Sequence, residues 1–167
     1  LDAAKRVRSF RRGESLFEQG APFLGVFCVE QGTVAVRKYD ENGNTVMVNL
    51  AHSGQTVGYQ DYFTSNGYSA RVEALEATTA CLVSPTALKQ ILRNNPSLGL
   101  QFLKHLAQDL DHAQELLLQK VLPVRTRLAH LLLTLKEQYG EVSGDGSVVI
   151  SLPMTRLDMT SMLGARH

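Results

Sequence analysis

Residues 58 to 74, GYQDYFTSNGYSARVEA, contain the side chains in this sequence that are best suited to hold a small molecule. The stretch opens at Gly58 and carries one carboxylate before an Asn-Gly turn, Asp61, and one arginine after it, Arg71. Gln60 and Ser69 could act as polar guides for a planar ligand. The aromatic side chains that would suit such a ligand are Tyr59, Tyr62, Phe63 and Tyr68. In the alternative interpretation the segment holds nothing, the tyrosines pack in the core, and the charged side chains are solvated.

The sequence lacks the residue patterns of several common kinds of catalytic site. A cupin-type metal site requires several histidines and a carboxylate on adjacent strands, whereas the strand-rich first half has a single histidine, His52. The sequence contains no Gly-x-Ser-x-Gly elbow, phosphate-cradling loop or zinc-type cysteine spacing. We therefore expect a binding protein and not an enzyme.

Composition limits the number of domains and the kinds of partner. The chain has 167 residues, 44% of them hydrophobic, which predicts one core or one core with a small appendage. With 17 Lys and Arg against 16 Asp and Glu, the net charge of +1 points to neither a nucleic acid nor a membrane. Any affinity for DNA must come from a local patch.

The two cysteines and the lack of long apolar runs indicate the cellular compartment of the protein. Cys28 and Cys81 lie in apolar, strand-like surroundings, which predicts small reduced core thiols and a cytoplasmic protein. No apolar run approaches the roughly 20 residues that span a bilayer. The first ten residues, LDAAKRVRSF, lack the apolar core of a signal peptide. We expect no membrane partner.

From Arg11 to about Pro85 the sequence is typical of short strands separated by glycines. Apolar and polar residues alternate, and we expect Val46, Val48 and Leu50 to share one face of a strand. Before that strand, ENGN at residues 41–44 contains the Asn-Gly dipeptide of a tight hairpin. The prediction is an antiparallel β-roll or barrel.

The pattern becomes helical after Ser84, which has the type and position of an N-cap followed by Pro85. A longer helix is predicted at about residues 97–120. Within it, five residues are spaced three and four apart, as in the seam of a coiled coil: Leu103, Leu106, Leu110, Ala113 and Leu117. We expect this seam to join two copies of the chain; in the alternative, the helix packs on its own domain.

The same helix carries further apolar residues outside the seam: Leu100, Phe102, Leu116 and Leu118. We expect them to pack on the β-domain, so that one helix serves two surfaces and transmits a signal. Residues 122 to 140 predict another helix, and GDGSVVISLP predicts a turn and a strand. In TRLDMTSMLG, Thr155 and Asp158 have nearly the spacing of a capping box at the start of a short helix.

The whole chain resembles the CRP/FNR superfamily of bacterial transcription regulators. LPMTRLDMTSMLG looks like the first helix and turn of the family's winged helix-turn-helix. GESLFEQG, VEQGTVAV and GQTVG resemble its β-roll. The resemblance implies an α+β chain with a jelly-roll effector domain at 1–96, a dimerisation helix at 97–121 and a winged helix-turn-helix at 122–167.

The resemblance also implies a cytoplasmic homodimer that senses an effector and binds double-stranded DNA and RNA polymerase. Thr155 and Arg156 would then contact DNA phosphates, which positions the module without reading sequence. The recognition helix that reads bases in the major groove is expected after His167. Base specificity therefore cannot be predicted, and this piece is not expected to bind DNA specifically.

In the family's cyclic-AMP-binding members, the segment matching residues 58–71 binds the nucleotide. There a Glu follows the glycine and bonds the ribose, and an Arg-Ser pair grips the cyclic phosphate. Here Tyr59 and Tyr68 stand at the positions of that Glu and that Arg, and a tyrosine cannot neutralise a phosphate. Arg71 would lie on the opposite face of an extended chain, roughly 10 Å further along. We therefore expect an effector other than cyclic AMP.

The predicted effector site comprises Gly58, Tyr59, Gln60, Asp61, Tyr68, Ser69 and Arg71. An iron-sulfur cluster is not expected, because no cysteine precedes Cys28. A haem that senses nitric oxide or carbon monoxide is one alternative, with axial ligands among the two cysteines, Met47, a tyrosine and four histidines: His52, His105, His112 and His130. A cyclic-nucleotide-binding regulatory module is the other. A redox switch through Cys28 and Cys81 would require Cα atoms within about 7 Å of each other.

Overall fold

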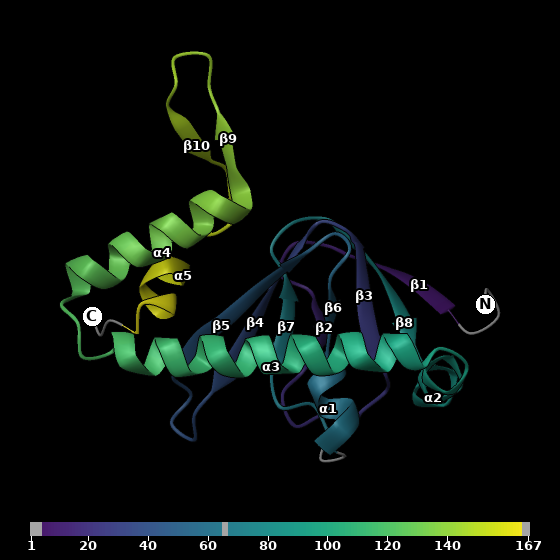
Figure 1. The fold of residues 1–167 in the computed structure, drawn as a ribbon. Helices are drawn as coiled ribbons and strands as arrows, with labels where there is room; N and C mark the ends of the chain where they lie inside the picture. The colour runs from purple at the N-terminus through teal and green to yellow at the C-terminus, as the bar shows by residue number, and fades with distance from the viewer. Residues whose placement is uncertain (1–4, 65–66, 165–167) are drawn as a thin grey trace. The chain divides into compact units, whose positions relative to one another are not determined.

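The computed structural model describes residues 5–64 and 67–164, in two compact units. The first unit ends at Asp109 and the second begins at Leu110. The first is a β-roll of two four-stranded antiparallel sheets (Figure 1), with the strand orders β1-β8-β3-β6 and β2-β7-β4-β5. The strands are β1 (Lys5–Phe10), β2 (Ser15–Phe17), β3 (Val26–Gln31), β4 (Thr33–Tyr39), β5 (Thr45–His52), β6 (Thr56–Val57), β7 (Arg71–Ala74) and β8 (Thr78–Val83). The predicted jelly-roll class is confirmed.

Side chains from both sheets fill the inside of the roll. The alternation along β7 shows the arrangement, since Val72 and Ala74 are buried while Arg71 and Glu73 are half-buried on the other face. The buried members of this core are Phe10, Leu16, Phe17, Phe27, Val29, Val34, Ala51, Val57, Tyr68, Val72, Ala74 and Ala80. Tyr68, a predicted effector residue, is therefore a member of the core.

The hairpin predicted at residues 41–44 joins β4 to β5, and Asp40 organises it. The Asp40 carboxylate accepts hydrogen bonds from the backbone of Asn42 (2.9 Å) and Asn44 (2.8 Å). The prediction that Val46, Val48 and Leu50 share a face is wrong. The pairing skips Val48, because Val36 lies opposite Asn49 and Arg37 lies opposite Met47. This bulge reverses the alternation, so that Val46 and Val48 are exposed while Met47 and Leu50 are buried.

The strand-rich unit contains α1 (Tyr59–Thr64) and α2 (Pro85–Asn94), and the long α3 (Pro96–Gln119) begins in this unit and continues into the second. Ser84 caps α2 as predicted, with its Oγ accepting from the backbone N–H of Ala87 at 3.3 Å. A second cluster lies outside the roll and combines strand and helix residues. Its buried members are Val26, Cys81, Val83, Ala87 and Leu88. Phe102 packs against this cluster as expected, whereas Leu100 and Leu118 are exposed, contrary to the prediction.

The second unit contains α4 (Val124–Tyr139), the hairpin of β9 (Gly140–Val142) and β10 (Val148–Ile150), and α5 (Arg156–Met162). The capping box predicted at the start of α5 is present in both directions between Thr155 and Asp158. An Arg127 Nη1–H on α4 donates to the Leu163 carbonyl just after α5, which ties the two helices together. Among the residues that the structure describes, no helix is both long and apolar enough to cross a membrane.

Candidate functional site

The cassette is defined here as residues 58–71, and it opens with the turn at Gly58 that leads into α1. Gly58 has a φ of +80°, which L side chains rarely adopt. A Cβ at this position would lie 3.2 Å from Cε1 of Tyr68 and 3.4 Å from Cζ of Phe17. Glycine therefore lets the start of α1 approach the aromatic core closely.

Tyr68 is fastened to the loop between β2 and β3 by both its backbone and its hydroxyl. Its backbone N–H donates to Ala21 O at 3.0 Å, and its carbonyl accepts from Gly20 N at 2.8 Å. Its phenol donates to Gly25 O at 2.7 Å and accepts from Leu24 N at 3.3 Å. The phenol thus has both a donor and an acceptor role filled from within the chain.

The Tyr68 ring is as closely held as its polar atoms. It stacks on Phe17 with 3.8 Å between ring centroids and 12° between planes, and it contacts Phe23 at 5.2 Å. Only 2% of Tyr68 is exposed. Burial raises the pKa of its phenol above the ordinary value of 10.0, so this group is neutral at physiological pH.

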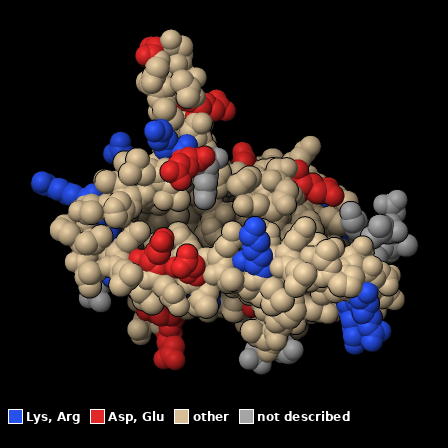
Figure 2. All heavy atoms as spheres, in the orientation of Figure 1, with Lys and Arg blue, Asp and Glu red and all other residues tan. Residues whose placement is uncertain are grey.

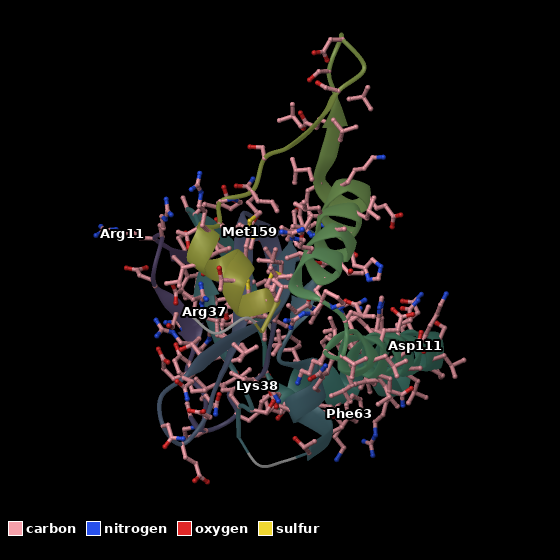
Figure 3. All side chains as sticks on the ribbon, turned by 90° about the vertical axis from the view of Figure 1, so that its left-hand side faces the viewer. Arg11, Arg37, Lys38, Phe63, Asp111 and Met159 are labelled. Atoms are coloured by element: carbon pink, nitrogen blue, oxygen red, sulfur yellow. The ribbon has the colours of Figure 1, made fainter. Side chains whose placement is uncertain are left out.

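Asp61 holds the far end of the cassette against α1. It is 4% exposed, and its Oδ1 accepts from the backbone N–H of Ser69 at 3.0 Å. The Ser69 side chain is itself exposed. Asp61 is therefore a buried side chain whose carboxyl group fixes the loop, and the interpretation of Asp61 as a merely solvated residue is wrong. Phe63, on the same helix and labelled in Figure 3, is 51% exposed.

Tyr59 and Gln60 connect the cassette to α3. The Tyr59 hydroxyl donates to Oδ2 of Asp109, and Gln60 Nε2 donates to the same oxygen at 2.9 Å. The Tyr59 ring also packs on Phe102, with 5.8 Å between centroids. Burial and, next, the Asp109 carboxylate raise the pKa of the Tyr59 phenol.

Asp109 is a site residue that the sequence analysis missed. Phe102 and Asp109 are seven residues apart, and this spacing places them on one face of a helix. That spacing from Phe102, which was expected to pack on the β-domain, is the signal that could have identified Asp109.

Arg71 is not brought together with Tyr68. It lies on β7, on the face opposite to the buried Val72. There its Nε donates to Ser15 Oγ at 2.8 Å and its Nη1 donates to Tyr39 OH at 3.1 Å. Ion pairs with Glu18 (3.6 Å) and Glu73 (3.3 Å) complete its surroundings.

The cassette therefore does not fit a cyclic phosphate. Arg71 is its one Lys or Arg, and that cation is held by other partners on the outer face. At the position where the resemblance places the phosphate-binding arginine, Tyr68 is neutral, packed and already hydrogen-bonded. Burying a phosphate against it would cost several kcal/mol, on the order of the penalty for an unpaired buried charge.

The described part of the chain, residues 5–64 and 67–164, supplies no set of side chains for a metal ion, whereas the haem alternative needs only one or two axial ligands and remains a prediction. No group of three or more His, Cys, Asp and Glu side chains in those ranges could hold a metal ion. His105 and His112, on α3, are exposed. Met47 is 2% exposed within its sheet.

The predicted dimer seam on α3 presents a row of uncovered leucines. Leu103 is 59% exposed, and Leu110 and Leu117 are each 61% exposed. Leu106 is half-buried and Ala113 is exposed. Figure 2 shows basic and acidic groups interspersed over one largely uncharged face of the molecule.

The predicted DNA-contact residues lie at the start of α5. Both Thr155 and Arg156 are exposed, and the Thr155 hydroxyl also serves the capping box by donating to Asp158 Oδ2 at 2.8 Å. They border an apolar groove of about 380 Å³ between α4, β10 and α5. Met159, labelled in Figure 3, is one of the groove's lining residues.

Comparison with known proteins identifies the family. The model of the cyclic nucleotide-binding domain matches residues 7–95, more than half of the chain. This chain belongs to that family, within the CRP/FNR superfamily. The chain is 27% identical over 164 residues to the "Transcriptional activator protein FnrA" of Stutzerimonas stutzeri. The aligned region covers 98% of the chain and 66% of that protein. It thus spans slightly less than two thirds of the length of this curated relative.

Solved structures support the fold of this CRP/FNR chain. FixK2 from Bradyrhizobium japonicum superposes with a TM-score of 0.83 at 22% identity, covering 96% of this chain and 78% of that one. The c-di-GMP responsive global regulator CLP from Xanthomonas campestris gives 0.84 at 17% identity, covering 98% and 82%. At these identities the likeness establishes architecture, and the function rests on the residues themselves.

Proposed function

We propose that this chain is the sensing and dimerising part of a cytoplasmic DNA-binding transcription regulator whose effector is not cyclic AMP. The strongest support is the contact between the cassette and α3. Tyr59 and Gln60, the first two residues of α1, converge on the single carboxylate of Asp109. A shift of α1 when an effector binds would therefore be transmitted directly to α3.

The helix that receives this contact also carries the dimer seam. Phe102 and Asp109 directly precede Leu103 and Leu110 in the sequence, so the cassette-facing row and the seam row are neighbours around the helix. A homodimer would cover the exposed leucines, because apolar side chains at this spacing pack well against a second helix. Rotation of α3 would then couple the cassette to the dimer geometry.

Small molecules are proposed to act at the edge of the cassette. The interior around Tyr68 is packed, whereas Gln60, Phe63 and Ser69 are exposed. A ligand with an apolar face and hydrogen-bonding edges would contact these residues and disturb the Tyr59–Asp109 bond. In the second unit, Arg156 would contact a DNA phosphate and Thr155 would hold the helix start in place.

The test uses the full-length gene product, tagged and expressed in its own bacterium. Chromatin immunoprecipitation is expected to give discrete sites, and these are expected to be lost in Leu110→Glu, because like charges would face each other across the seam. The matched control is Leu118→Glu, which places the same charge on a 73% exposed leucine beside the seam. Analytical ultracentrifugation should show Leu110→Glu as a monomer and the control as a dimer. Absence of discrete sites for the unaltered protein, or a dimeric Leu110→Glu, would refute the proposal.

A further inference from the structure

The two cysteines of the chain lie directly opposite each other on neighbouring strands. In the antiparallel pairing of β3 with β8, Cys28 is the partner of Cys81. Both are thiols, not a disulfide. Residues that face each other in this way project from the same side of the sheet. Both cysteines accordingly belong to the cluster outside the roll, where Cys28 packs against a core that includes Cys81.

The backbone hydrogen bonds of Val29 define the type of pair. The N–H of Val29 donates to Gln55 O and its carbonyl accepts from Gly54 N, both at 2.8 Å, on the β6 side of β3. Since successive residues of a strand bond to opposite sides, the backbone of Cys28 faces β8. Cys28 and Cys81 then form a hydrogen-bonded pair, for which the Cα atoms are about 5.5 Å apart. Disulfides span Cα separations of roughly 4.4–6.8 Å.

The two thiols differ in access to solvent. Cys28 is half-buried, and the Thr56 hydroxyl donates to its sulfur at 3.7 Å. Cys81 is only 2% exposed. A soluble oxidant would therefore meet Cys28 first, and the sulfur of Cys81 is placed to react next.

We propose that Cys28 and Cys81 form a reversible oxidation site for peroxides. Hydrogen peroxide oxidises the Cys28 thiol to a sulfenic acid and releases one water. The Cys81 thiol then attacks that sulfur and displaces its oxygen as a second water, leaving one disulfide. Two thiols and one peroxide are thus converted into one disulfide and two waters, and the peroxide takes up the two electrons.

The bond formed in this way is readily reduced. Opposed Cβ atoms in a sheet are roughly 4.5–5.5 Å apart, whereas a disulfide holds them at roughly 3.5–4.5 Å. The strands must draw together to make the bond, and such strain makes a disulfide more reducible. The site goes beyond the proposed function and does not depend on it.

The test treats the reduced chain with hydrogen peroxide, blocks remaining thiols with N-ethylmaleimide under denaturing conditions and maps the peptides by mass spectrometry. We expect one intramolecular link between the peptides that carry Cys28 and Cys81, reversed by millimolar dithiothreitol. Persistence of both alkylated thiols, a sulfinic acid at Cys28 beside a Cys81 thiol, or a link between two chains would overturn the proposal.

Single-cysteine variants test the order of the two steps. Cys81→Ser should retain oxidation at Cys28 and accumulate a sulfenic acid that dimedone traps. The Cys81 thiol that remains in Cys28→Ser should react with peroxide at least about tenfold more slowly than the Cys28 thiol of Cys81→Ser, because Cys81 is buried and access limits the reaction. Equal oxidation rates for the two variants would contradict the assignment of Cys28 as the first site. Circular dichroism of each variant, compared with the unaltered chain, verifies that the roll is folded.

Discussion

Replacing Tyr68 with phenylalanine removes the hydroxyl of this residue and keeps its ring, so the contribution of the hydroxyl can be measured alone. The phenyl ring of Tyr68→Phe keeps the stacking on Phe17, whose centroid lies 3.8 Å away. The variant loses the 2.7 Å bond to Gly25 O and the 3.3 Å bond from Leu24 N. The Gly25 carbonyl then lacks this donor. Because Gly25 is buried, leaving its carbonyl unsatisfied costs about 1–3 kcal/mol.

We expect the free energy of unfolding to fall by about 2 kcal/mol, most of it from Gly25, because the bond to Leu24 is longer. With an m-value of about 2 kcal/mol/M, the urea midpoint would fall by about 1 M. The chain has no tryptophan, so far-UV circular dichroism is the appropriate signal.

The matched control for this variant is Tyr62→Phe. Tyr62 is half-buried on α1, and its ring contacts Phe23 at 6.3 Å and Phe63 at 5.1 Å. These ring contacts survive the substitution, so the change should stay within about 0.5 kcal/mol. If Tyr68→Phe also changed stability by less than about 0.5 kcal/mol, the hydroxyl would not be what holds the cassette closed, and the reasoning would fail.

Three further results are expected. A double-mutant cycle of Tyr59→Phe with Asp109→Ala should give a coupling energy of about 1–2 kcal/mol in urea unfolding, because the bond joins a half-buried phenol to a carboxylate. If the two changes in unfolding free energy added within error, the contact would not couple α1 to α3. Stability should decline above about pH 10, because burial raises the pKa of the Tyr68 phenol above its unfolded value. The contribution of the neutral phenol to stability is complete below the unfolded pKa and is lost as the pH rises through the folded pKa. If urea unfolding of Tyr68→Phe declined as steeply with pH, the effect would belong to another group. Millimolar cyclic AMP should leave the melting temperature unchanged, because the one arginine of the cassette, Arg71, is held by Ser15, Tyr39 and two glutamates on the outer face; a rise of several degrees would contradict the assigned role of Tyr68.

Local patterns in the sequence were enough to predict most of the elements. The Asn-Gly hairpin, the Ser84 cap and the Thr155 capping box depend on residues within four positions of each other, and each is present. The prediction that Leu50 shares a face with Val46 and Val48 was wrong, because the single extra residue in β5 depends on the pairing with β4 and not on the strand's own pattern.

The candidate site was harder to predict, because its contacts join distant segments. The substitution of tyrosine for the expected arginine is visible in the sequence, but the partners of Tyr68 lie more than forty residues away, at Leu24 and Gly25. Asp109 is 50 residues from Tyr59. Likewise, the two cysteines are each in a strand-like segment, and only the register of β3 on β8 places them opposite each other.

We expect the hydrogen bonds of Tyr68 also to affect how long the protein survives in the cell. A cassette that relies on a bound nucleotide opens when the nucleotide is scarce, and its loop then becomes a substrate for proteases. Here Tyr68 supplies both the ring and the hydrogen bonds from within the chain, so these contacts do not depend on a bound nucleotide. We expect turnover of the protein then to be set by the stability of the roll, so that its abundance would not follow the cyclic nucleotide level of the cell.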